Sequence, residues 1–136
     1  YVGPAIAWFD LERGDIDHGV RFSTELIERF EAEGTHRFSA EMRYWRGRLL
    51  ATRSAWSEAV ADFRTALTLL DGTGARAVQW PIQSALAKAL EASGDRGAEA
   101  QRLSARATVD SIAGDLHEAG LRHSFLSRPE VAQLHG

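Results

Sequence analysis

The sequence predicts an all-α protein, an α-solenoid of about three antiparallel helix hairpins followed by a C-terminal capping helix. Apolar residues recur at spacings of three and four over long intervals between glycines, which is the spacing of one face of an α-helix. No run of β-branched and aromatic residues alternates with polar ones, so the pattern does not indicate strands. Small residues also recur at a constant interval along the chain, which indicates a repeated helical unit.

Glycines and short polar residues mark where the helices end and begin. Glycine readily adopts the left-handed conformation that closes a helix, and a following Asp or Thr can accept hydrogen bonds from the free N–H groups of the next helix. We expect Asp15 and Thr35 to act in this way. Helices are predicted over residues 4–13, 16–33, 36–52, 55–71, 76–93, 96–115 and 129–135, with a break near Gly120.

Two sets of small residues each recur at an interval of 40 residues. The first set lies within the first helix of each hairpin, and the second lies at the turn that joins the two helices. The sets are Ala7, Gly47 and Ala87, and Gly14, Ser54 and Gly94. Antiparallel helices approach closely only where side chains are small. We therefore expect one domain over residues 1–136, with hairpins over about 1–34, 35–74 and 75–115 that stack on one another, and a cap over 116–136.

The second helices carry the residues expected at the hairpin crossings. In the middle hairpin Ala59, Phe63 and Ala66 are expected to pack against the first helix, and Ala100 and Ala107 are expected to do the same in the third hairpin. Near the C-terminal end, Leu121, Phe125 and Leu126 are expected to cover the last apolar face. Pro129, at the start of the capping helix, needs no helical hydrogen bond there.

This pattern resembles the tetratricopeptide repeat (TPR), which places a small residue within the first helix and then Gly, an aromatic residue, Ala, a large apolar residue and Ala. The best copy here is Gly47, Ser54, Trp56, Ala59, Phe63, Ala66 and Leu67. The period is longer than the family's usual value of about 34, and Ser54 replaces the turn glycine. The chain, including residues 121–131, is similar to the divergent repeats of the C-terminal regions of bacterial multidomain signalling ATPases and transcriptional regulators. The resemblance implies a fragment of a larger protein.

In that family the first helix of each hairpin lines a concave surface. The resemblance implies that Trp8, Tyr44, Arg48, Ser84 and Lys88 contact a partner. It therefore implies a non-enzymatic module for protein–protein interaction or scaffolding, within a regulatory or sensor protein. The partner would be a protein or peptide or another domain of the same polypeptide, and a homo-oligomer is left open. An accessory domain of an enzyme and a groove that senses a small-molecule inducer are the alternative functions.

The sequence predicts no catalytic, cofactor-binding or metal-binding residue. His117-Glu118 lacks the second histidine of a zinc-protease helix, because Leu121 stands at that position. The loop at residues 72–74 lacks the Lys-Ser/Thr of a phosphate-binding loop. All five histidines are expected at the surface. The absence of cysteine suits a reducing compartment, so a cytoplasmic location is expected, and no apolar stretch is long enough to cross a membrane.

Charge gives little reason to expect nucleic-acid binding, since the formal net charge is −3. The one basic stretch is residues 37–53, with five arginines against Glu41 alone. Exposure to solvent or ion pairs within the chain is the favoured interpretation of these arginines. An acidic protein partner and, less favoured, a phosphate or nucleic acid are the alternatives.

Overall fold

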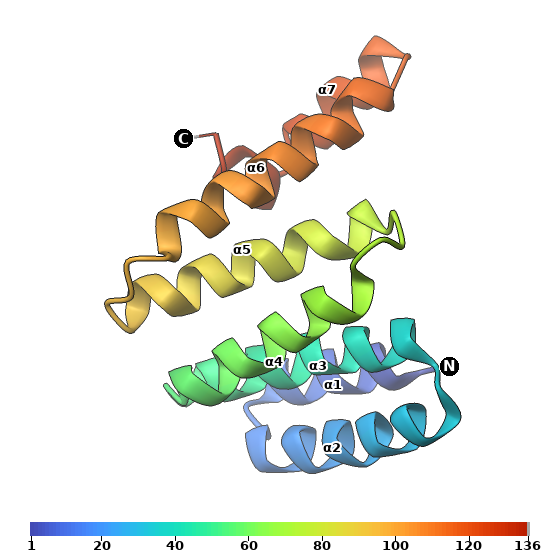
Figure 1. Ribbon diagram of the computed structural model, residues 1–136, viewed down its shortest axis with the longest axis vertical. Helices are drawn as coiled ribbons and strands as arrows, with labels where there is room; N and C mark the ends of the chain where they lie inside the picture. The colour runs from blue at the N-terminus through green and yellow to red at the C-terminus, as the bar shows by residue number, and fades with distance from the viewer. Residues whose placement is uncertain (136) are drawn as a thin grey trace.

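The chain folds into helices joined by short turns. A computed structural model describes residues 1–135, and over this range it contains α-helices and no strand (Figure 1). The helices are α1 (Gly3–Arg13), α2 (Ile16–Glu33), α3 (His36–Thr52), α4 (Trp56–Leu70), α5 (Arg76–Ala92), α6 (Ala98–Asp115), α7 (Ala119–Leu126) and α8 (Pro129–Ala132). The prediction of an all-helical fold is confirmed.

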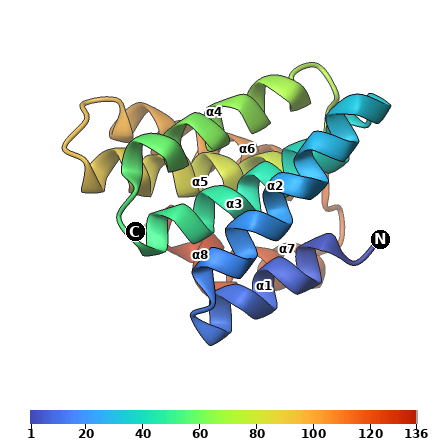
Figure 2. The ribbon, with the colours of Figure 1, turned by 90° about the horizontal axis from the view of Figure 1, so that it is seen from below.

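Each helix packs against the next one along the chain. Two pairs of helices separated by one helix in the sequence, α1 with α3 and α3 with α5, also contact each other. Figure 1 shows the helices following one another along the long axis, from α1 and α2 at one end to α6 and α7 at the other. The view along that axis shows α8 on the same side of α3 and α5 as α1 (Figure 2).

Four turns share one backbone geometry, and three of them lie at the predicted interval, whereas the fourth, at Gly34, joins α2 to α3. Gly14, Ser54 and Gly94 have φ angles of 75°, 61° and 75°. In each turn the N–H of the next residue donates to a carbonyl five residues earlier, over 2.9 Å after Gly14, 3.0 Å after Ser54 and 2.8 Å after Gly94. This is the long hydrogen bond of the Schellman motif. Ser54 holds the left-handed conformation despite its Cβ, so the three predicted turn positions share one backbone conformation.

Small residues lie where the helices cross, as predicted. Ala7, Gly47 and Ala87 are all buried. A Cβ atom added to Gly47 would lie 2.5 Å from Cε1 of Phe63, a separation too short for two carbon atoms. Phe63 itself is 1% exposed. Helices α3 and α4 therefore approach so closely that the phenyl ring of α4 rests directly on the backbone of α3.

The middle of the chain forms the largest apolar core. It joins α3, α4 and α5 and includes Ala59, Phe63 and Ala66 from the predicted crossing. A second cluster around Ile27 and Met42 joins the first three helices. The third joins α5 and α6 to the C-terminal segment, and its buried members are Trp80, Ala105, Val109, Val131 and Leu134.

The C-terminal region differs from the prediction in three respects. Helix α7 was not predicted, and the expected break at Gly120 lies in its first turn, where a glycine does not interrupt the hydrogen-bond ladder. The prediction that Leu121 covers the apolar face is wrong, because its side chain is 56% exposed. Helix α8 ends at Ala132 and residues 133–135 form turns, so the predicted helix over 129–135 is too long.

The buried face of α6 also differs from the expected one. Ala100 and Ala107 are exposed, whereas Ala105, Val109 and Ala113 are buried. Helix α6 turns this face toward Trp80 of α5 and toward the C-terminal segment. The third hairpin thus keeps the turn of the repeat but not its second-helix contacts.

The side-chain caps expected at Asp15 and Thr35 are absent. Asp15 and Thr35 precede α2 and α3, but neither side chain accepts a capping hydrogen bond. Backbone bonds across the turns order these junctions instead, such as the 2.9 Å bond from the Thr35 N–H to the Phe30 carbonyl.

The contact between Gly47 and Phe63 predicts that Gly47→Ala changes the free energy of unfolding in opposite directions in the wild-type and Phe63→Ala backgrounds. In the wild-type background we expect Gly47→Ala to lower the free energy of unfolding by about 1 to 3 kcal/mol, because the new methyl group overlaps the ring. In a Phe63→Ala background the overlap is gone, and the same change should raise the free energy of unfolding by roughly 0.5 to 1 kcal/mol through helix propensity. Urea denaturation of the four proteins measures both values, and equal effects in the two backgrounds would refute the close packing.

Candidate binding groove

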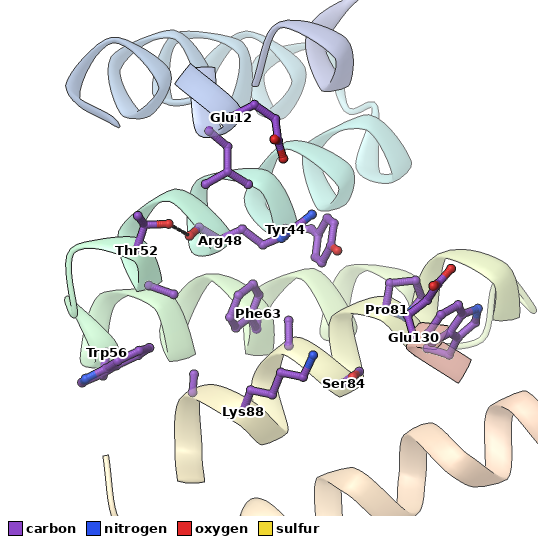
Figure 3. A pocket seen from close by; sticks show the side chains of 15 residues that line it. Glu12, Tyr44, Arg48, Thr52, Trp56, Phe63, Pro81, Ser84, Lys88 and Glu130 are labelled. Atoms are coloured by element: carbon purple, nitrogen blue, oxygen red, sulfur yellow. Dashed lines mark hydrogen bonds between the residues drawn. The ribbon is translucent and has the colours of Figure 1, made fainter. Parts of the chain in front are cut away.

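Four of the five residues expected to contact a partner line a single groove. Tyr44 and Arg48 come from α3, and Ser84 and Lys88 come from α5. The groove has a volume of about 560 Å³ and is completed by residues of α1, α4 and α8 (Figure 3). Because α3 contacts both α1 and α5, residues from all three helices can face one space.

Aromatic and small side chains form the walls of the groove. Trp56 of α4 contributes aromatic surface, and Ala85 of α5 also lines the groove. Phe63 and Trp80 border it from within the core, because they are buried. Phe63 is also part of the central core, so the wall is rigidly supported. Polar and charged side chains also line the groove, among them Glu12, Thr52 and Ser84.

Aromatic rings hold the guanidinium group of Arg48 in place. Its Cζ atom lies 5.7 Å from the ring centroid of Tyr44 and 5.0 Å from that of Trp45. Both distances are within the range of a cation–π interaction. Burial raises the pKa of Tyr44 above its ordinary value, and the charge of Arg48 opposes this only in part. Tyr44 therefore stays a neutral hydroxyl beside a fixed cation.

The other polar groups of the groove come from three helices. Glu12 of α1, Lys88 of α5 and Glu130 of α8 border the space, and Glu130 pairs with Arg128 at 2.8 Å. Within residues 1–135, neither Arg48 nor Lys88 forms an ion pair with a carboxylate. The groove therefore presents two cations whose charge is not neutralised by direct contact.

Trp8, the fifth expected residue, does not line the groove. Its side chain is 49% exposed on α1. It lies four residues before Glu12, which does border the groove, and residues four apart lie on the same face of a helix. Trp8 therefore lies on the same face of α1 as Glu12, next to the groove but outside it.

A second hollow adjoins the first. It has a volume of about 550 Å³ and shares Ser84 and Lys88 with the groove. Residues of α5, α6 and the segment after α8 line it, among them Arg96, Gln133 and Leu134. The sequence did not indicate that the C-terminal segment borders both spaces, because that depends on where the chain returns after α7.

Most arginines of the stretch 37–53 form ion pairs within the chain. Arg46 binds Asp62 of α4 through two hydrogen bonds of 2.8 and 2.7 Å, which raise the pKa of Arg46. Arg43 also contacts Asp62, at 3.3 Å, and contacts Glu31. Arg37 and Arg53 pair with Glu41 and Asp17. The favoured interpretation as ion pairs is confirmed for four of the five arginines, and Arg48 is the exception among the described residues.

One cluster of possible metal ligands was not predicted. A ligand atom from each of Asp10, Asp15 and His18 lies within 4.8 Å of the others. Asp10 is buried and its Oδ2 lies 2.7 Å from Nδ1 of His18. The spacing of the histidines alone does not indicate this pairing, because the partner of His18 is a carboxylate on the other side of a turn. A signal was present, since Asp10 stands where the other copies have Leu50 and Leu90.

The remaining expectations about the surface agree with the structure. All five histidines, including His117 and His123, are exposed. No helix of the described chain is long and apolar enough to span a membrane.

The ion pairs of α3 predict that Asp62→Asn lowers the free energy of unfolding more than Asp17→Asn does. Asp62→Asn leaves Arg46 without a carboxylate, which should lower the free energy of unfolding by about 3 kcal/mol. We expect the lower end of the range for buried pairs because the arginine side chains keep some contact with water. Asp17→Asn removes an exposed pair and should cost less than about 1 kcal/mol. Chemical denaturation of both variants measures the difference, and similar small losses would show that the Asp62 pairs contribute little.

Comparison of the chain with protein-family models, with curated proteins and with solved structures gives no match, so the geometry of the groove is what supports a function.

Proposed function

We propose that this chain is a TPR-like α-solenoid that binds a segment of a protein partner in the groove between α1, α3 and α5, without catalysing a reaction. The observation that carries the proposal is that Tyr44, Arg48, Ser84 and Lys88, chosen from their place in the repeat, line one groove. These residues share the first helices of the second and third hairpins.

The repeated backbone geometry supports the solenoid part of the proposal. The turns at Gly14, Ser54 and Gly94 recur at one interval with the same hydrogen bond. The first helices of the three proposed hairpins, α1, α3 and α5, contact their neighbours in order. In a stacked repeat such neighbours form one continuous surface, and that surface is the usual place for recognition.

The chemistry of the groove favours a peptide as the ligand. Aromatic side chains with a polar edge, together with arginine, dominate the binding energy of protein interfaces. Trp56, Tyr44 and Arg48 supply these groups, and Lys88 adds a second cation. The exposed Trp8 on the adjoining face of α1 lengthens the surface beyond the groove, as an extended partner requires.

A small-molecule sensor is the second candidate. The groove volume of about 560 Å³ lies within the range of sites that enclose small ligands. Binding of phosphate or nucleic acid is less favoured, because carboxylates already neutralise most arginines of the basic stretch. A setting in a larger regulatory protein, a cytoplasmic location and self-association stay predictions.

A peptide selection tests the proposed function. We would select peptides from a random displayed library on the wild-type chain and measure their dissociation constants by fluorescence anisotropy. Arg48→Ala and Lys88→Ala are each expected to weaken binding about tenfold, equivalent to about 1.4 kcal/mol. Both side chains line the groove, so their loss should leave folding intact, and circular dichroism checks this.

Arg64→Ala is the matched control. Arg64 is exposed on α4 and lines neither the groove nor the adjoining hollow, so its substitution should not change the affinity. Peptides whose binding is equally insensitive to Arg48→Ala, Lys88→Ala and Arg64→Ala would contradict the proposal. A small organic molecule retained by the wild-type chain in native mass spectrometry, and lost in the Arg48→Ala variant, would favour the sensor instead.

A further inference from the structure

The segment after α7 borders the proposed binding surface. Glu130 lines the groove, whereas Gln133 and Leu134 line the adjoining hollow. The two spaces share Ser84 and Lys88, so this segment lies against both parts of one surface. Figure 3 shows Glu130 beside Pro81 at the α5 side of the groove.

Two apolar side chains anchor the segment. Val131 is 0% exposed and Leu134 is 5% exposed. Both pack against Trp80 of α5 and against Ala105 and Val109 of α6. Residues three apart lie on one face of a helical turn, so the pair forms a small apolar face directed at α5 and α6.

Polar contacts add little to this anchoring. Nε2 of His135 lies 2.8 Å from Oδ1 of Asp110 at a partly exposed position, and Arg128 pairs with Glu130 within the segment itself. Helix α8 has four residues, and a helix of that length has no stability of its own in water. The conformation of the segment therefore depends on the surface against which it packs.

We infer that residues 129–135 act as a built-in ligand that a partner segment displaces. The partner we infer is a short amphipathic helix that presents two apolar residues three positions apart, after an acidic residue. This matches the Glu130-Val131-x-x-Leu134 pattern that the chain itself places there. The inference rests on the proposed function, because the groove must be the binding surface.

Because residues 129–135 are covalently connected to the rest of the chain, they occupy the surface of α5 and α6 when no partner is bound. A tethered ligand acts at an effective concentration on the order of millimolar. A free peptide with these two apolar anchors and a dissociation constant of about 0.1 mM would be roughly tenfold weaker in the presence of the tethered segment, because competition scales with the ratio of the two values. A partner with the same two anchors and further contacts to the groove can therefore displace the segment without unfolding α5 and α6.

Nuclear magnetic resonance with the full chain tests this inference. The probe is a peptide of residues 128–135 with blocked ends, titrated into isotope-labelled protein. Leu134→Asp should release the built-in segment, and the peptide should then shift the amide signals of Trp80, Ala105 and Val109 with at least tenfold higher affinity than in the wild type. Ala132→Asp introduces the same side chain at an exposed position of α8 and should behave as the wild type does.

Two outcomes would overturn the inference. One is a folded Leu134→Asp chain that binds the peptide no more tightly than the wild type. The other needs no variant: amide exchange in wild-type residues 131–134 that is as slow as in α6 would show that the segment opens only with the rest of the fold. If library peptides still depend on Arg48 and Lys88 in either case, the proposed function stands and this inference alone fails.

Discussion

The close approach of α3 and α4 is the constraint on which the rest of the structure depends. Gly47 leaves room for the ring of Phe63, and this contact sets the distance between the two helices. Phe63 lies in the central core and also borders the groove. The same side chain therefore stabilises the fold and helps to shape the proposed binding surface. Asp62, the preceding residue on α4, binds Arg43 and Arg46 of α3. Apolar packing and ion pairs thus fasten the same two helices through neighbouring residues.

This arrangement divides the arginines of α3 between two roles. Arg43 and Arg46 turn toward Asp62 and are neutralised within the chain, whereas Arg48 lies over aromatic rings and borders the groove. Because Arg43 and Arg46 form ion pairs within the chain, their charges are not available to a partner. The cation–π contacts hold the charge of Arg48 in a fixed position where a partner can reach it. In the proposed function, specificity for a partner therefore resides in a few oriented groups rather than in overall charge.

Local patterns in the sequence predicted much of the fold. The spans of α2 and α3 and the turns at Gly14, Ser54 and Gly94 agree with the structure, because periodicity and left-handed turns are properties of short segments. The resemblance to the TPR family pointed to Tyr44, Arg48, Ser84 and Lys88, which line one groove, and to Trp8, which does not line it. Features set by distant contacts were not predictable in this way. The buried face of α6 depends on Trp80 and on the returning segment around Val131, and the pairing of Asp10 with His18 depends on the angle between α1 and α2.

The close approach of α3 and α4 is tested most directly by the proton chemical shifts and nuclear Overhauser contacts of Gly47 in solution. A ring packed on the backbone of α3 displaces the Hα resonances of Gly47 from their random-coil positions and gives nuclear Overhauser contacts between these protons and the Phe63 ring. We expect both effects, and we expect the part of the displacement that the ring causes to be lost in Phe63→Leu, which leaves the shift typical of a helical glycine. Random-coil Hα shifts for Gly47, without contacts to Phe63, would contradict the account, because α3 and α4 would then be too far apart to form the groove as described.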